Sequence, residues 1–216
     1  MSSPHQLSAA EALQRDAVEA TRRASAALLS LQTDEGYWWA DLTADTTLES
    51  DYILLQLWLH PPVNGEWKPK TRPLIDKAVT SILRRQLPNG GFNIYPEGPA
   101  DVSATVKAYF SLKLAGVPAS DPRMVRARNT ILSLGGIQAA NSYVKLNLSF
   151  FGLFPREFCP SVPPEMMLLP GDFIYQMSSW TRAIVIPLSI IHAMQPKRPV
   201  PDGFDLLELF VPGGTR

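Results

Sequence analysis

Glu49 and Asp51 form a pair of carboxylates separated by one residue, a composition that general acid and base chemistry uses. Glu49 also follows Thr46 by three residues, which is the spacing of a capping box at the start of a helix. In that case its carboxylate bonds to the backbone of the first turn and does no chemistry. The capping interpretation is favoured for Glu49, and a carboxylate pair is the alternative.

Other catalytic and metal-binding patterns are missing from the sequence. His5, His60 and His192 lack the paired spacing of metal ligands, so each is interpreted as a surface or packing histidine. The single cysteine, Cys159, excludes an internal disulfide and a multi-cysteine metal site, and fits a reducing compartment. There is no glycine-rich phosphate loop, nucleophile elbow or dinucleotide fingerprint. We therefore expect no metal and no cofactor.

The chain contains five tryptophans, and most of them are expected to be core or turn residues. Trp180 differs because it begins an apolar helix after a long proline-rich connection, where the end of a helix can project into a cavity. A packed core position remains the alternative for this residue. An indole face that lines a cavity would suit a cation or a hydrocarbon.

Charge and hydropathy exclude several partners. The 20 basic residues balance the 20 acidic ones, so no net field attracts nucleic acid. The most apolar run, from Ala183 to Met194, is twelve residues long and contains Pro187, whereas a spanning helix needs about 20 apolar residues. Acidic residues near the N-terminus, such as Glu11, do not fit a secretory signal. A peripheral membrane contact stays open.

A short pattern of glutamine, glycine and an aromatic residue occurs twice. The matching positions are Gln32, Gly36 and Trp38 in the first copy and Gln86, Gly90 and Phe92 in the second. The two glycines are 54 residues apart, a length that suits one pair of helices with its turns. The later pair Gly135-Gly136 fits a degenerate third copy.

The residue types in this pattern suit a connection between helices. A glutamine side chain carries one acceptor and two donors, so it can bind the free backbone groups at a neighbouring helix end. The glycine allows a positive φ just after a helix, and the ring then packs beside it. We therefore expect the six positions to be structural.

Helix-start signals and apolar spacing predict the elements that carry these residues. Capping boxes begin helices at Ser8 and Thr46, and another helix runs from about Pro73. Further helices are expected after Asp101, after Asp121 and from about Ser178. An apolar run covers Tyr143 to Phe151, and residues 155–170 are expected to form an irregular connection with at most a helical turn.

No segment shows the alternation of a strand, so the fold class is predicted to be all-α. A repeat of about 50 residues fits a solenoid or a closed ring of helical hairpins. We divide the chain into an N-terminal helix, residues 1–27, a helical domain, residues 28–199, and a divergent C-terminal tail, residues 200–216. The tail contains several prolines and is interpreted as a frayed end or a segment that leads elsewhere.

From about Leu28 to Pro199 the chain resembles the N-terminal region of squalene-hopene cyclases, within the triterpene cyclase and mutase family. The segments that carry the resemblance are Gln32 to Trp39, Gly90 to Pro99, Gly135 to Ile137, Val162 to Glu165, and Ser179 to Ala183. Their order and spacing cover most of the chain.

The resemblance implies an incomplete α/α barrel, the inserted N-terminal barrel of such enzymes. It implies squalene or a similar linear triterpene as substrate, protonated by an Asp-x-Asp-Asp motif and cyclised through carbocations that ring faces stabilise. Trp180 would then line the cavity, with Met177 and Val185 near its access channel, Tyr143 close to the cavity, and Glu49 at an acidic position of the family. The family also implies peripheral attachment to the cytoplasmic side of a membrane, or a soluble cytoplasmic fragment.

This sequence departs from the family at several positions. The Asp-x-Asp-Asp motif does not occur in this sequence. Lys107 stands where the family leads us to expect an acidic residue, Asn141 where an arginine is usual, and Asn147 where a tryptophan is usual. We therefore expect no catalytic residue in this chain and no cyclisation by the chain alone. The alternatives are a non-catalytic helical remnant, a subunit that pairs with a separate C-terminal half, and an α/α barrel from another terpenoid or prenyl-transfer enzyme.

Overall fold

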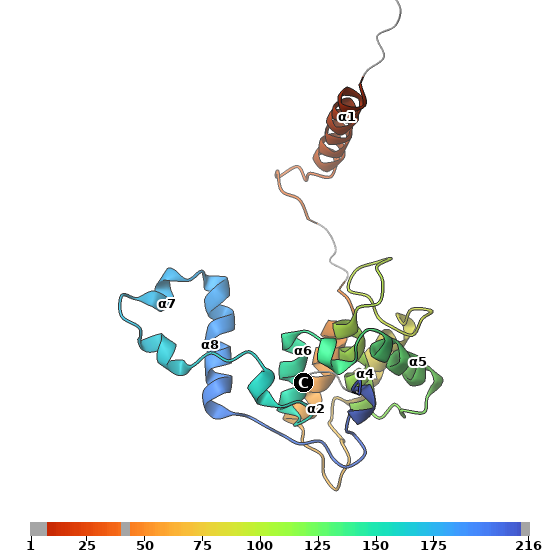
Figure 1. The fold of residues 1–216 in the computed structure, drawn as a ribbon, viewed down its shortest axis with the longest axis vertical. Coiled ribbons are helices and arrows are strands. Elements are labelled where there is room, and N and C mark those ends of the chain that lie inside the picture. The colour runs from red at the N-terminus through yellow and green to blue at the C-terminus, as the bar shows by residue number, and fades with distance from the viewer. Residues whose placement is uncertain (1–7, 40–43, 213–216) are drawn as a thin grey trace, which may run out of the picture. The chain divides into compact units, whose positions relative to one another are not determined.

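The computed structural model describes residues 8–39 and 44–212 and divides the chain into two compact units, Met1–Thr43 and Ala44–Arg216 (Figure 1). The domain limits expected after residues 27 and 199 stay predictions. Each unit is described by itself below.

The first unit contains helix α1, Ala9–Ser30. The predicted capping box is confirmed: the Glu11 amide donates to Ser8 Oγ at 3.3 Å, and the Ser8 amide donates to Glu11 Oε2 at 2.8 Å. After α1 the chain turns, and Trp38 Nε1 donates back to the Leu28 carbonyl at 2.6 Å. This bond satisfies one of the carbonyls that the end of the helix leaves free.

The second unit is a succession of helices. They are α2 (Thr47–Leu59), α3 (Arg72–Arg84), α4 (Val102–Leu114), α5 (Pro122–Ser133), α6 (Ser142–Phe150), α7 (Phe173–Gln176) and α8 (Ser179–Met194), with short 3-10 turns η1 (Ile137–Ala139), η2 (Arg156–Phe158), η3 (Pro164–Leu168) and η4 (Leu207–Leu209). No strand occurs in residues 8–39 and 44–212, where the nearest feature is one isolated bridge between Val63 and Glu66. The predicted all-α class is confirmed.

Helices α2 and α3 form an antiparallel hairpin. Thr71 Oγ1, just before α3, donates to Gln56 Oε1 near the end of α2 at 2.8 Å. At the opposite end, Ser81 Oγ in α3 donates to Glu49 Oε1 in the first turn of α2 at 3.0 Å. Helices α4 and α5 pack against each other as the next pair. Successive helix pairs of this kind are the units expected of the partial α/α barrel that the family resemblance implies.

Helix α4 is the centre of the second unit. It contacts α2, α5 and α6 (Figure 1), and every residue from Ala104 to Leu114 is buried. Asp101 caps its start, since the Ala104 amide donates to Asp101 Oδ1 at 2.8 Å, as predicted. The buried stretch includes Lys107 and Lys113, whose charges need partners inside the fold.

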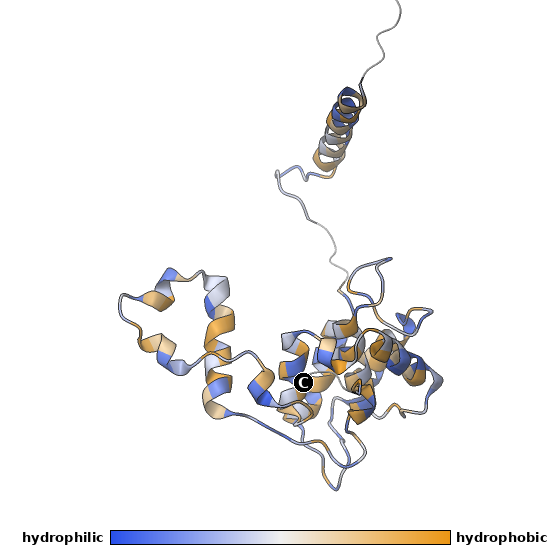
Figure 2. Cartoon of the chain, viewed as in Figure 1, coloured by the Kyte–Doolittle hydropathy of each residue, from blue (hydrophilic) through white to orange (hydrophobic). Residues whose placement is uncertain are grey.

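Helix α8 follows the irregular connection and packs against η3. Figure 2 shows apolar residues along most of its length. Pro187 lies inside this helix. The large apolar side chains that η3, α7 and α8 and their connections leave exposed are Leu168, Leu169, Tyr175, Trp180, Ile186, Ile190 and Met194. Within the described ranges, no helix combines the length and the apolar character needed to cross a membrane.

The C-terminal segment packs back onto the helical unit. Leu206 and Leu209 are buried, and η4 contacts α5. Gln138 Nε2 donates to the Val211 carbonyl at 3.0 Å, and the Val211 amide donates to Gln138 Oε1 at 3.2 Å. Over residues 204–211 the structure therefore differs from a frayed end, because two leucines and paired backbone groups fix this segment.

Candidate functional site

Three of the predicted substrate residues lie on one short segment. Met177 precedes α8, and Trp180 and Val185 lie within α8. Ser178 caps the start of this helix, because its side chain accepts from the Thr181 amide at 3.1 Å. The Trp180 side chain is 78% exposed, whereas Met177 and Val185 are partly buried. The three residues thus belong to one segment of the chain, and their contact with a substrate stays a prediction.

Tyr143 lies in the first turn of α6 and is 58% exposed. Asn141, where the resemblance leads us to expect arginine, caps this helix: its Oδ1 accepts from the Val144 amide at 3.0 Å. The backbone N–H of Asn141 donates to Ser103 Oγ at 2.9 Å, and this bond joins the start of α6 to α4.

Glu49 does not form the predicted capping box. Its Oε1 accepts from Arg85 Nη2 at 2.5 Å and from Ser81 Oγ at 3.0 Å, both at the end of the α3 hairpin arm. Asp45 caps α2 instead, since its Oδ1 accepts from the Thr47 amide at 2.8 Å. The capping interpretation of Glu49 is wrong because a long-range guanidinium competes with the local backbone for its carboxylate.

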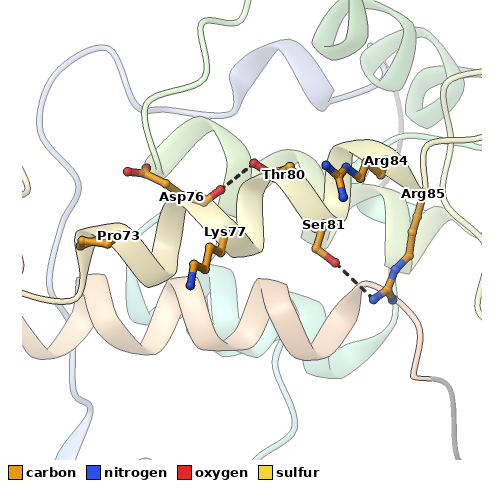
Figure 3. Close-up of a pocket in the computed structure, with 7 residues that line it drawn as sticks. All are labelled: Pro73, Asp76, Lys77, Thr80, Ser81, Arg84 and Arg85. Atoms are coloured by element: carbon orange, nitrogen blue, oxygen red, sulfur yellow. Dashed lines mark hydrogen bonds between the residues drawn. The ribbon is translucent and has the colours of Figure 1, made fainter.

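A hollow of about 560 Å³ lies beside α3. Figure 3 shows the residues that line it, which are Pro73, Asp76, Lys77, Thr80, Ser81, Arg84 and Arg85. All seven residues belong to this helix or directly follow it. Arg85 turns toward Ser81 and so toward Glu49, and Thr80 donates to the Asp76 carbonyl. A hollow lined by a single helix brings no groups from different elements together, so we assign no chemistry to it.

A second hollow of about 450 Å³, here called the α2–α6 hollow, lies beside α2 and α6. Its lining residues are Asp51, Leu54, Leu55, Trp58, Asn147, Phe150, Phe151, Ile191 and Pro196. The Trp58 ring centroid lies 5.7 Å from that of Phe150 and 5.6 Å from that of Phe151, both in tilted or edge-on arrangements. Seven of the nine residues are apolar, so the hollow can accommodate a hydrocarbon.

The polar side of the α2–α6 hollow is a cluster of three residues. Lys107 Nζ donates to Asp51 Oδ2 at 2.7 Å, and Asn147 Nδ2 donates to Asp51 Oδ1 at 3.3 Å. Lys107 and Asn147 are two of the positions at which the sequence departs from the family. The structure thus brings both departures to the same carboxylate, a relationship that the sequence did not predict.

Two arginines hold the aromatic wall of this hollow. The Arg198 guanidinium lies 4.9 Å from the Trp58 ring centroid, and the Arg156 guanidinium lies 5.0 Å from that of Phe150. Arg198 Nη1 also donates to the Trp58 carbonyl, and the Arg198 backbone N–H donates to the Phe150 carbonyl at 2.8 Å. These contacts fix the rings to the chain that returns from α8.

Sequence analysis missed this hollow, although a signal for it was present. Asp51, Leu54, Leu55 and Trp58 follow the spacing i, i+3, i+4, i+7, which places them on one face of a helix. Asn147, Phe150 and Phe151 follow i, i+3, i+4 in the next partner helix. The spacing therefore indicates which face of each helix these residues share. It does not indicate that the two faces lie next to each other, because that depends on the tertiary fold.

His192 lies next to Ser161, and a serine beside a histidine is the arrangement of a nucleophile with its general base. Its Nδ1 lies 2.5 Å from Ser161 Oγ, in the wall of a hollow of about 550 Å³. Gln195 Nε2 donates to the His192 carbonyl at 2.6 Å. The Ser161 contact joins the end of α8 to the segment after η2, which agrees with a packing histidine.

The two glutamine motifs adopt the same turn. Gln32 Nε2 donates to the Gly36 carbonyl at 2.7 Å, and Gln86 Nε2 donates to the Gly90 carbonyl at 2.9 Å. Both glycines have a positive φ, +90° and +91°. Gln86 also donates to the Arg123 carbonyl in the first turn of α5 at 2.8 Å, so this copy connects two helices as expected.

Comparison with known proteins agrees with the all-helical structure. The squalene-hopene cyclase N-terminal domain matches residues 21–216. Squalene-hopene cyclases of Zymomonas mobilis and Alicyclobacillus acidocaldarius are 38% and 36% identical to the chain over 195 and 191 residues. The matched regions cover 88% and 87% of this chain but only 28% and 29% of those relatives.

The dammaradiene synthase of Dryopteris crassirhizoma, a relative named for another product, is 32% identical over 198 residues. These residues cover 90% of this chain and 28% of the relative. The similarity thus extends beyond hopene-forming enzymes, and in each case this chain spans less than a third of its relative. The match over residues 21–216 and these identities show that the chain belongs to the squalene-hopene cyclase family and corresponds to its N-terminal domain.

Proposed function

We propose that this chain forms the N-terminal part of an enzyme that cyclises squalene or a similar linear triterpene to polycyclic, hopanoid-type products. The observation that carries this proposal is the 38% identity over 195 residues to the squalene-hopene cyclase of Zymomonas mobilis. The repeated glutamine turns support a scaffold role, since the Gln86 side chain connects the end of α3 to the start of α5.

Cyclisation of a hydrocarbon begins with protonation, which needs a strong acid. Because Asp-x-Asp-Asp is not found in the 216 residues, we propose that the chain by itself does not ionise squalene. Carboxyl groups become strong enough acids only when neighbouring charges and hydrogen bonds arrange them, and Glu49 is already bound to Arg85 at 2.5 Å. The acid is then supplied by a further polypeptide segment.

The expected substrate contacts belong to the same proposal. Trp180 would offer an indole face to cationic intermediates, and Tyr143 would lie close by. Met177 and Val185 would border the access channel, and Glu49 would lie at the edge of the cavity. The exposure of Trp180 and Tyr143 supports this assignment, because both rings are available to a segment or substrate that packs against them.

We also propose that the complete enzyme contacts the cytoplasmic side of a membrane peripherally. Squalene is apolar and dissolves in the hydrocarbon region of a bilayer, so the enzyme must collect it there. Seven large apolar side chains exposed around η3, α7 and α8 support a surface of this kind.

The first experiment incubates the purified chain with squalene and analyses the products by gas chromatography and mass spectrometry. We expect no cyclised product. Formation of hopene by the chain alone would overturn the proposed need for an external acid.

The second experiment supplies the missing acid. The chain is produced together with the part of the Zymomonas mobilis relative that lies outside the matched region, and the cells are given squalene. Restored cyclisation would support a subunit or N-terminal domain of a cyclase. Persistent inactivity in a complex that forms stably would favour the non-catalytic remnant over a cyclase domain.

A further inference from the structure

We propose that Ser161 and His192 form a nucleophile and general base that hydrolyse small neutral esters. The pair lies in the wall of the hollow of about 550 Å³ beside α6 and α8, here called the α6–α8 hollow. Ser161 supplies the attacking hydroxyl group, and the His192 ring accepts its proton. This activity goes beyond the proposed cyclase function, because it breaks an ester bond and needs no acid motif.

The α6–α8 hollow brings together groups from several elements, unlike the hollow beside α3. Its walls come from α6, from η2 and the connection after it, and from α8 and the segment that follows α8. A volume of about 550 Å³ lies within the range of small-molecule pockets, roughly 300–1,000 Å³. Leu146, Pro155, Pro160 and Ile191 supply apolar surface against which a short acyl group can pack.

The geometry of the pair suits proton transfer. His192 Nδ1 lies 2.5 Å from Ser161 Oγ. A neutral imidazole carries its proton on one nitrogen, so a His192 ring protonated at Nε2 accepts the Ser161 hydrogen bond at Nδ1. The base thus already contacts the proton that the hydroxyl must lose when it attacks. Ser161 is exposed, so a substrate can reach this hydroxyl.

The end of α8 supports the charge that this transfer creates. His192 lies in the last turn of α8, which ends at Met194. The carbonyl end of a helix carries a partial negative charge and stabilises a cation in its last turn. An imidazolium formed at His192 is stabilised in this way. The helix end therefore takes the place of the carboxylate that stabilises the imidazolium of a catalytic triad.

Two groups in the same wall can stabilise the oxyanion that forms when an ester carbonyl is attacked. The Gln195 amide has two N–H donors, and its bond to the His192 carbonyl at 2.6 Å uses one of them. Across the described ranges, no carboxylate lies within ion-pair distance of the Arg156 guanidinium. The second Gln195 N–H and the Arg156 charge are therefore available to the oxyanion.

Glu157 restricts the class of ester. It lines the α6–α8 hollow and is exposed. A substrate that carries its own carboxylate would be repelled by this side chain, because like charges at close range oppose binding. The hollow therefore favours esters without a negative charge.

The proposed reaction has two steps. In the first, Ser161 Oγ bonds to the ester carbonyl carbon while His192 Nδ1 takes the hydroxyl proton; the bond from this carbon to the alcohol oxygen then breaks, and His192 gives the proton to the leaving alcohol. In the second, water attacks the acylated Ser161, and its proton passes through His192 to Oγ as the carboxylic acid leaves. One ester and one water give one acid and one alcohol.

The test incubates the purified 216-residue chain with p-nitrophenyl acetate and follows the release of p-nitrophenolate. Ser161→Ala removes the nucleophile and should lower the rate at least about tenfold, since positioned acid-base groups contribute about 10²–10⁴-fold. Ser120 provides the matched control, because it is another exposed serine and lies outside the hollow. Ser120→Ala should keep the rate within about twofold of wild type.

A substitution of the base separates chemistry from packing. The amide of His192→Gln can still bond to Ser161 but cannot take its proton. The rate should therefore fall at least about tenfold while circular dichroism and the thermal melt stay those of the wild type. His60 is exposed and caps the end of α2, so His60→Gln serves as the control for a histidine that reacts with the ester directly. Equal rates in wild type, Ser161→Ala and His192→Gln would overturn the proposal.

The covalent intermediate gives an independent readout. Wild type quenched with acid during turnover should carry an acetyl group on Ser161, which peptide mass spectrometry locates, and His192→Gln should carry at least about tenfold less at this position. Acetyl groups on lysines alone would show non-specific acyl transfer and would contradict the assignment. Cyclisation is measured separately with squalene, so failure of the ester assay and failure of the cyclase proposal are distinguishable.

Discussion

Lys113 Nζ lies 2.6 Å from Glu208 Oε1, and this ion pair joins the last turn of α4 to a segment 95 residues later in the chain. The same Glu208 oxygen accepts from the Tyr109 hydroxyl at 2.9 Å, and Lys113 also donates to the Asp205 carbonyl. The side chain of Lys113 is 11% exposed, so its charge depends on this one segment for compensation. The segment around η4 therefore closes the buried face of the central helix.

Replacing Glu208 by alanine should lower the free energy of unfolding by about 2–3 kcal/mol, since the change leaves a buried ammonium without its carboxylate. Urea denaturation of the purified chain measures the effect. Glu208→Gln keeps an acceptor for Tyr109 and should cost less than Glu208→Ala. The exposed Glu165 provides a control, because Glu165→Ala should change stability by less than about 0.5 kcal/mol. Equal effects at both positions would contradict the prediction.

Tyr109 should make stability depend on alkaline pH. Burial of its ring, together with a hydrogen bond and the negative charge of Glu208, raises the pKa of Tyr109 well above its ordinary value of 10. The folded state therefore holds this proton more tightly than the unfolded state, and the resulting stability is fully present below pH about 10. It is lost as pH rises from 10 toward the folded pKa.

The measurement compares wild type with Tyr109→Phe between pH 9 and 11, values chosen to bracket the ordinary pKa of tyrosine, about 10. The difference in unfolding free energy between the two proteins should shrink as pH rises. Tyr175 lies in an exposed position, and Tyr175→Phe should show no such trend. A difference that stays constant for Tyr109→Phe would show that its hydroxyl titrates alike in both states.

Local helix signals were predictable from the sequence, but contacts across the chain were not. Ser8 and Glu11 form the predicted capping box, in which each side chain binds the backbone N–H of the other residue. The same spacing failed at Thr46 and Glu49, because Arg85 lies 36 residues later and holds the Glu49 carboxylate. A capping rule weighs only neighbours within one turn, so it cannot include a competing guanidinium from another helix.

The polar cluster of the candidate site shows the same limit. Lys107 and Asn147 were recognised as unusual residues, and Asp51 as half of a possible carboxylate pair. Their convergence depends on how α2, α4 and α6 pack, and the residues are 40 to 96 positions apart. A buried charge needs a partner of opposite charge, and only the tertiary fold shows which residue that partner is.

Gln86 should contribute more to stability than the equivalent Gln32. Gln86 Nε2 bonds to the Gly90 and Arg123 carbonyls, and its Oε1 accepts from Arg126 at 3.3 Å, so it connects α3 to α5. Gln86→Ala should cost about 1–2 kcal/mol in urea denaturation. Gln32 bonds within its own turn, and Gln32→Ala should cost less than about 0.5 kcal/mol. If Gln86→Ala and Gln32→Ala lower the unfolding free energy by similar amounts, the bond from Gln86 to the Arg123 carbonyl adds nothing to stability.

Two glycines separate the effect of backbone strain from that of close packing. Gly90 and Gly65 both have a positive φ, +91° and +79°, so an alanine at either position is strained by about 1–2 kcal/mol. At Gly90 a Cβ would also lie 2.5 Å from Arg126 Cβ and 2.6 Å from the Arg126 backbone carbon, whereas nothing lies within 4 Å of a Cβ at Gly65.

Gly90→Ala should therefore lower the unfolding free energy by about 3 kcal/mol or more, because α5 must move away from the turn to admit the methyl group. Gly65→Ala should cost only the strain of about 1–2 kcal/mol. Thermal and urea denaturation of both variants give the comparison. The added loss in Gly90→Ala should fall when Gln86→Ala is introduced as well, since a displaced α5 no longer holds the Gln86 bond to Arg123. Full additivity of the two substitutions would show that the turn and the glutamine bond hold α5 independently.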